Sequence, residues 1–185
     1  MISQQAKDGL EFTMVNALKD ALAAPGEDRC DVEVIDSIKG IKDKKMVVLT
    51  VSSYMFRVMT MMYFTMNKPT KQHLARINRA EVSDMDDTAF IDVICECGNI
   101  ACGALNRALA QHFPHIGMST PNILDNDSAG YLNSLNPNHV QHFKVRVNET
   151  LTIYATLCFC AFTDINFAVD MTATTEESSG ELEMF

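Results

Sequence analysis

The stretch that decides the fold is FIDVICECGNIACGALN, residues 90–106. Its apolar side chains recur at the 3.6-residue spacing that is typical of a helix with one buried face. The predicted buried face, continued by one turn, consists of Ile91, Ile94, Cys95, Ala101, Cys102, Leu105 and Leu109. The opposite face carries a polar stripe that consists of Asp92, Glu96, Asn99, Gly103 and Asn106. The segment therefore predicts a long helix that covers a core and exposes one polar stripe.

This polar stripe differs in composition from an ordinary solvated helix face, because it has acidic side chains but no Lys or Arg of its own. Gly98 and Gly103 each cost about 1 kcal/mol relative to Ala in a helix interior. Such glycines indicate that another backbone approaches closely. For Gly98, packing on a sheet and approach of a partner are equally good interpretations. For Gly103, which lies on the polar stripe, approach of a partner is favoured.

Glu96 and Asn99 lie three positions apart, so their side chains project side by side from the helix. A carboxylate can bind a cation on a partner, and an amide can hold and orient a water molecule. On spacing alone, an exposed helix face remains the better interpretation of this pair.

The segments around the helix predict a mixed α and β domain. The helix is expected to begin after a cap at Ser83 or Asp84, with Asp86 and Asp87 in its first turn, and to end before Pro114. Long helices packed on an antiparallel sheet make the expected fold class α+β. Residues 1–172 are expected to form a single domain, and the acidic residues 173–185 a flexible tail. The other expected elements are helices at 3–23 and 53–63, strands at 31–35, 46–51, 139–147, 150–161 and 166–172, a loop at 65–84 that leaves room for one short helical piece, and a loop at 122–138.

The charge balance restricts the class of partner. The 185-residue chain has a formal net charge of −9, and residues 80–185 carry 3 basic against 15 acidic side chains. Such a chain lacks the basic surface with which proteins bind nucleic-acid phosphates. It begins without a signal peptide, and polar residues interrupt its most apolar run, 46–66. We therefore expect a cytoplasmic protein that binds neither nucleic acid nor a membrane.

The six cysteines are expected to be free thiols in a reducing compartment. Cys95 and Cys97 would point about 200° apart on a helix, so they cannot hold one metal ion together. Cys95 and Cys102 are assigned to the buried face, and Cys158 and Cys160 to one face of a strand. Burial as small apolar side chains is favoured over a zinc or iron–sulfur site. Two His-x-x-His pairs could bind a metal in principle, but no metal site is predicted.

The polar stripe resembles the signature of the CheC/CheX/FliY family of chemotaxis phosphatases. In that family an acidic or Ser position, a Glu and an Asn lie on one long helix, and a Pro follows the helix. The corresponding residues here are Asp92, Glu96, Asn99 and Pro121. The run Glu96-Cys-Gly-Asn-Ile-Ala-Cys-Gly103 is similar to the family's Glu-Leu-Gly-Asn-Met-x-x-Gly.

The resemblance implies a CheC-like fold and a phosphatase that acts on the phospho-aspartate of a CheY-like response regulator. The pathway would be chemotaxis or another two-component system. Glu96 would pair with the active-site Lys of the regulator, and Asn99 would hold the attacking water. Asp92, Gly103 and Asn106 are assigned to binding the partner. The Mg²⁺ would belong to the regulator, and the chain would need no metal or cofactor of its own.

The resemblance extends over residues 5–172 and is most specific at 86–124. Some members carry a second Glu/Asn pair on the first helix. Here Glu11 and Asn16 are five positions apart and do not share a face, which makes the chain more like CheX. CheX-like proteins dimerise by joining their sheets, so a homodimer through the strands of 139–172 is expected. The alternative is a non-catalytic binding module like the related domain of flagellar switch proteins, which lacks the Glu/Asn pair.

Overall fold

The computed structural model describes residues 1–171, so the expected tail at 173–185 lies outside the described residues. The helices are α1 (Gln4–Leu22), α2 (Lys68–Ile77) and α3 (Asp87–Ala110), with 3₁₀ segments η1 (Val82–Asp84) and η2 (Asn126–Leu135). The strands are β1 (Cys30–Ile35), β2 (Lys45–Ser52), β3 (Phe56–Phe64), β4 (Gly117–Met118), β5 (Asn122–Asp125), β6 (His139–Val147) and β7 (Leu151–Ala161). The predicted α+β class is therefore confirmed.

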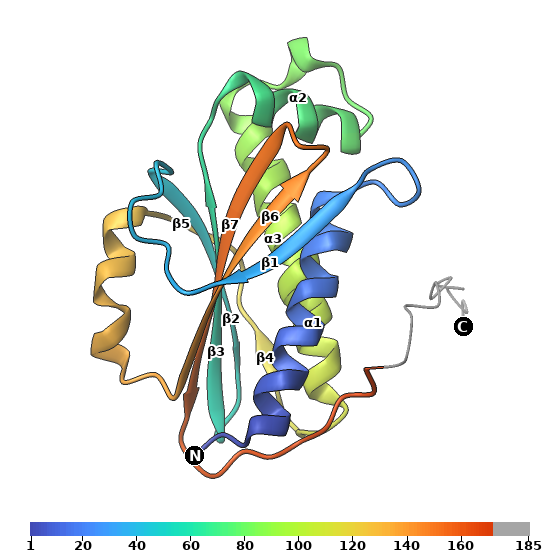
Figure 1. The fold of residues 1–185 in the computed structure, drawn as a ribbon. Coiled ribbons are helices and arrows are strands. Elements are labelled where there is room, and N and C mark those ends of the chain that lie inside the picture. The colour runs from blue at the N-terminus through green and yellow to red at the C-terminus, as the bar shows by residue number, and fades with distance from the viewer. Residues whose placement is uncertain (172–185) are drawn as a thin grey trace, which may run out of the picture.

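The strands form one antiparallel sheet in the order β1-β6-β7-β3-β2-β4, and β5 also pairs with β2. α1 and α3 lie side by side on one face of this sheet (Figure 1), with α3 against β2 and α1 nearer to β1 and β6. The opposite face is partly covered by η2 and by the segment 36–44 that joins β1 to β2. The main core lies between the sheet and the two long helices and includes Phe56, Phe64, Phe90, Phe143 and Phe159.

The segment after β2 is a strand, and the helix predicted for residues 53–63 is wrong. The Ser53 side chain accepts a hydrogen bond from the Phe56 N–H at 3.3 Å, as a helix cap would. The Ser53 N–H, however, donates to the Phe56 carbonyl and closes a hairpin between β2 and β3. β3 is apolar on both faces, because Met61 and Tyr63 are buried on the side away from the main core. Periodicity does not distinguish such a run from a buried helix.

The cap of α3 also differs from the prediction. Asp86 is the cap, because its carboxylate accepts a hydrogen bond from the Ala89 N–H at 2.8 Å. Ser83 and Asp84, the predicted caps, belong to η1 instead. The helix ends at Ala110, slightly before the predicted end.

Two predictions in the second half of the chain are wrong as well. Residues 122–138 are not an irregular loop, because they contain β5 and η2. The described part of 166–172 forms no strand. Phe167 and Val169 pack there against Gly9 of α1, so this segment covers the helix layer rather than extending the sheet.

The buried side of α3 is wider than predicted, because the helix packs against both α1 and the sheet. Ile91 and Cys95 are only half-buried. The fully buried residues are Phe90, Ile94, Cys97, Gly98, Ala101, Cys102, Leu105 and Leu109. Among residues 1–171, α3 is the one helix long and apolar enough to cross a membrane. Its apolar side is already covered by α1 and the sheet, as in the core helix of a globular domain.

Candidate functional site

Gly98 brings the middle of α3 into close contact with the sheet. A Cβ atom at this position would lie 2.8 Å from Leu49 Cδ1 and 2.9 Å from Val47 Cγ1, both on β2. These distances are shorter than carbon atoms tolerate, so only glycine allows this approach. Of the two interpretations of Gly98, packing on the sheet is therefore confirmed. The polar stripe is held on the far side of the helix from this contact.

Glu96 and Asn99 lie together on the surface of α3, as their spacing predicts. The Asn99 side-chain Nδ2 donates a hydrogen bond to Glu96 Oε2 at 3.1 Å. Glu96 is exposed and Asn99 is half-exposed. Among residues 1–171, no cation forms an ion pair with Glu96 or with Asp92. The pair is thus a preformed, solvent-facing carboxylate and amide.

The rest of the predicted stripe differs in exposure from one residue to the next. Asp92 is exposed, whereas Gly103 and Asn106 are partly covered. A Cβ atom at Gly103 would find only the Arg107 Nη1 within 4 Å, at 3.5 Å. No other element in the described part of the chain therefore approaches Gly103. The buried Oδ1 of Asn106 has no hydrogen-bond partner among the described residues.

Pro121 lies at the edge of the sheet beside the site helix. The Ser119 N–H donates to the Thr50 carbonyl at 2.9 Å, and Asn122 pairs with Val48. Pro121 is therefore level with the residue between them on β2, Leu49, whose side chain contacts Gly98. Pro121 thus lies along β2 at the level where Gly98 holds α3 against the sheet.

A groove of about 400 Å³ opens beside Glu96, between α3 and the C-terminal ends of α1 and α2. Val93 and Ile100 of α3 line it on one side, and Arg76 and Arg79 on the other. The sequence does not predict this groove, because its residues come from three separate helices and the segments that follow them.

A buried polar cluster holds the ends of α1 and α2 together next to this groove. The Asp28 side chain accepts hydrogen bonds from Arg76, from Asn148 and from the Ala24 N–H. Desolvation by burial raises the pKa of Asp28, but these hydrogen bonds outweigh it and lower the pKa to about 2. His73 Nε2 lies 2.7 Å from the carbonyl of Leu22, the last residue of α1. The walls of the groove are thus fixed.

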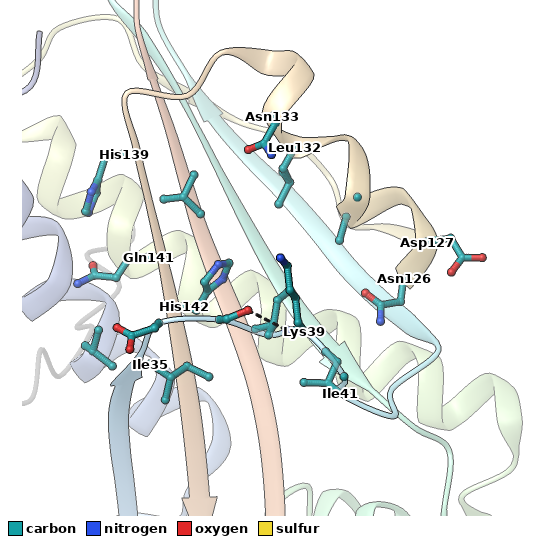
Figure 2. A pocket seen from close by; sticks show the side chains of 18 residues that line it. Ile35, Lys39, Ile41, Asn126, Asp127, Leu132, Asn133, His139, Gln141 and His142 are labelled. Atoms are coloured by element: carbon teal, nitrogen blue, oxygen red, sulfur yellow. Dashed lines mark hydrogen bonds between the residues drawn. The ribbon is translucent and has the colours of Figure 1, made fainter.

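A second, larger hollow of about 890 Å³ lies between η2, the segment 34–41 and β6 (Figure 2). Neither Glu96 nor Asn99 lines it. Figure 2 shows Lys39 reaching into this space beside His142, while the carboxylate of η2 residue Asp127 points outward.

His142 on the wall of this hollow belongs to a buried polar chain. Its Nδ1 lies 2.8 Å from Thr156 Oγ1, and the Tyr63 hydroxyl donates to the same Oγ1 at 3.2 Å. Burial lowers the pKa of His142, so the neutral ring is favoured. Thr156 Oγ1 thus links the Tyr63 hydroxyl to the His142 ring.

The cysteines are arranged as small apolar side chains. Cys97 is buried, and Cys95, which the sequence assigns to the buried face, is only half-buried. Burial is the main cause that raises the pKa of Cys97 and of Cys158 to about 12, and neighbouring groups add to it. Both thiols therefore stay protonated. Among residues 1–171 no three His, Cys, Asp or Glu side chains gather as metal ligands would.

No protein-family model matches the sequence, and no curated protein matches it. Solved structures do match. CheX from Borrelia burgdorferi, solved as a CheX–CheY–BeF₃–Mg²⁺ complex, is 14% identical with a TM-score of 0.59, and the match covers 83% of this chain and 96% of that one. A CheC-like superfamily protein from Shewanella sp. PV-4 is 12% identical with a TM-score of 0.56, covering 86% of this chain and 99% of that one.

The chemotaxis protein CheX from Vibrio vulnificus is 12% identical with a TM-score of 0.55, covering 81% of this chain and 95% of that one. At these identities the likeness concerns the fold. The chain therefore has the CheC-like fold, shared with CheC-like and CheX proteins.

Proposed function

We propose that this chain is a phosphatase that hydrolyses the phospho-aspartate of a CheY-like response regulator. The observation that carries the proposal is the hydrogen-bonded Glu96–Asn99 pair, exposed on a helix that is pinned to the sheet. The match to a CheX solved together with CheY, BeF₃ and Mg²⁺ supports a response regulator as the partner.

The hydrogen bond between the two residues orients the amide. Because Asn99 Nδ2 donates to Glu96, the carbonyl Oδ1 is free to accept a hydrogen bond from water. A water held there is positioned for in-line attack on the phosphorus. Its oxygen bonds to phosphorus, the bond from phosphorus to the aspartate oxygen breaks, and the electron pair leaves on the carboxylate. The protons of the water stay with the phosphate that is released.

Charge neutralisation comes from the regulator in this proposal. Phosphoryl transfer depends on cations around the phosphoryl oxygens, and the Mg²⁺ and Lys of the regulator supply them. Glu96 pairs with that Lys and thereby aligns the two proteins. Asp92 and Asn106 contact the regulator, and Gly103 leaves room for its backbone. The chain itself contributes no metal or cofactor.

The protein is also proposed to be a cytoplasmic homodimer. The interface expected from residues 139–172 needs correction, because β6 lies between β1 and β7, and β7 lies between β6 and β3. Among residues 1–171, the edges of the sheet that pair with no further strand are β1 on one side and β4 and β5 on the other. A dimer that joins sheets therefore uses one of these edges, and sedimentation of the intact chain tests whether the protein is a dimer.

A radiolabelled phospho-regulator, purified from its phosphodonor and supplied with Mg²⁺, tests the activity. Wild type is expected to accelerate phosphate release, whereas Asn99→Ala is not. Asn133→Ala, on exposed η2 and far from the site, is the matched control and is expected to behave like wild type. Equal rates for wild type and Asn99→Ala would refute the proposal. Tight regulator binding without turnover would favour the alternative, a non-catalytic binding module.

A further inference from the structure

The C-terminal end of α2 has an arginine where helices favour glycine. The Ala80 N–H donates to the Ala75 carbonyl at 2.9 Å, and the Arg79 N–H donates to the Arg76 carbonyl at 3.0 Å. These two bonds form a Schellman motif, which places Arg79 in the left-handed conformation, with φ of 54°. Glycine adopts this conformation freely, whereas a residue with a Cβ atom is strained. Stability alone therefore favours glycine at position 79.

The side chain of Arg79 lines the same groove as Glu96. Arg76, three residues earlier, forms ion pairs with Asp28 and Glu27 and so connects α2 to the segment that follows α1. Arg79 is exposed and forms no ion pair with any residue of 1–171, although Asp20 also lines the groove. The groove thus presents the Glu96 carboxylate from α3 and, from the turn that follows α2, an Arg79 guanidinium with no ion-pair partner among residues 1–171.

We propose that Arg79 binds a side-chain carboxylate on the surface of the regulator, beside the Lys that Glu96 binds. This inference rests on the proposed function. Two opposite charges carried by separate segments of the groove select a partner with the complementary pair and reject the reversed order. Asn99, which orients the water at the phosphorus, does not line the groove. Arg79 therefore lies on the side of Glu96 away from the phosphoryl group, and its ligand is a carboxylate of the regulator.

Arg79→Gly tests this inference, because it removes the strain and the charge together. The melting temperature of the variant is expected to rise by about 2–4 °C. Its Kd for the purified regulator, measured by calorimetry, is expected to weaken roughly threefold to tenfold at low salt and less at high salt. The loss should be equal with and without BeF₃ and Mg²⁺ on the regulator, and turnover at saturating regulator should not change. Arg79→Lys keeps the charge and should retain most of the affinity.

Glu149→Gly is the matched control, because Glu149 also has a positive φ, 57°, but lies in the turn between β6 and β7. It should raise the melting temperature and leave the Kd unchanged. If the wild-type protein is active and Arg79→Gly binds the regulator with the same Kd, this inference is overturned and the proposed function stands. A loss confined to the BeF₃ form would also overturn it, in favour of a phosphoryl contact. If the wild-type protein binds the regulator without hydrolysing its phospho-aspartate, and Arg79→Gly binds it more weakly, the inference is supported and the proposed phosphatase activity is refuted.

Discussion

The two glycines of α3 allow one substitution to be tested in two environments on the same helix. Replacing a helix-interior Gly by Ala gains about 1 kcal/mol of intrinsic helix stability. At Gly103 the new Cβ atom would meet only Arg107 Nη1, at 3.5 Å, an ordinary contact. Gly103→Ala is therefore expected to raise the free energy of unfolding by about 1 kcal/mol.

At Gly98 the new Cβ atom would lie 2.8 and 2.9 Å from the side chains of Leu49 and Val47. Both neighbours lie in the core, so the helix or the strand has to shift, and overpacking of this kind costs about 1–3 kcal/mol. After the gain in helix propensity, Gly98→Ala is expected to be about 1 kcal/mol less stable than wild type. The two variants should thus differ by about 2 kcal/mol.

Urea unfolding of both variants measures this difference, provided that the slope with denaturant stays the same. Equal stabilities would refute the reasoning, because they would mean that the sheet accommodates a methyl group at Gly98 freely. Phosphate release from the phospho-regulator gives a second readout. Gly103→Ala should slow it despite higher stability, since the methyl group occupies the surface proposed for the partner. An unchanged rate and Kd would exclude Gly103 from that surface.

Three further predictions concern charges and a buried hydrogen bond. Glu96→Ala should weaken regulator binding and turnover together; calorimetry that finds tight binding with lost turnover would contradict the pairing with Lys. Asp28 has a native pKa of about 2 against an ordinary 3.8, so its stabilising effect is present above about pH 4 and is lost as the pH falls towards 2. The difference in unfolding free energy between wild type and Asp28→Asn should therefore shrink over this window, and a constant difference in acid titrations would argue against it. Thr156→Val leaves the buried Tyr63 hydroxyl without its oxygen acceptor and should cost about 1–3 kcal/mol in urea unfolding, whereas Thr152→Val, exposed on the same strand, should be nearly neutral.

The sequence allowed the proximity of Glu96 and Asn99 to be predicted because these two residues are local. Glu96 and Asn99 are one helical turn apart, so their proximity follows from helix geometry alone. The groove with Arg79 could not be predicted, because it depends on how three helices meet. The position of Pro121 beside Leu49 depends likewise on the pairing of β5 with β2.

The errors in the fold have a common physical cause. Ser52 and Ser53 stand where a helix cap is expected and so predict a helix at 53–63, but β3 forms there, with both faces apolar and the second face covered by η2, which is distant in the sequence. The exchange of Cys95 for Cys97 on the buried side arises similarly, because α1 covers part of α3 in addition to the sheet. The spacing of apolar residues identifies an element when only one of its faces is buried. Where two neighbouring elements bury two faces, this spacing no longer distinguishes a helix from a strand.

Anchoring the Glu96–Asn99 pair within a 24-residue helix has a consequence for timing. In the proposed function no lid closes over the phosphoryl group, and both residues already hold their positions before the regulator arrives. The delay between encounter and hydrolysis then contains no loop closure of the kind that limits many enzymes. We therefore expect the lifetime of the phosphorylated regulator to follow the cellular concentration of this protein, so that a change in its expression resets the duration of the signal.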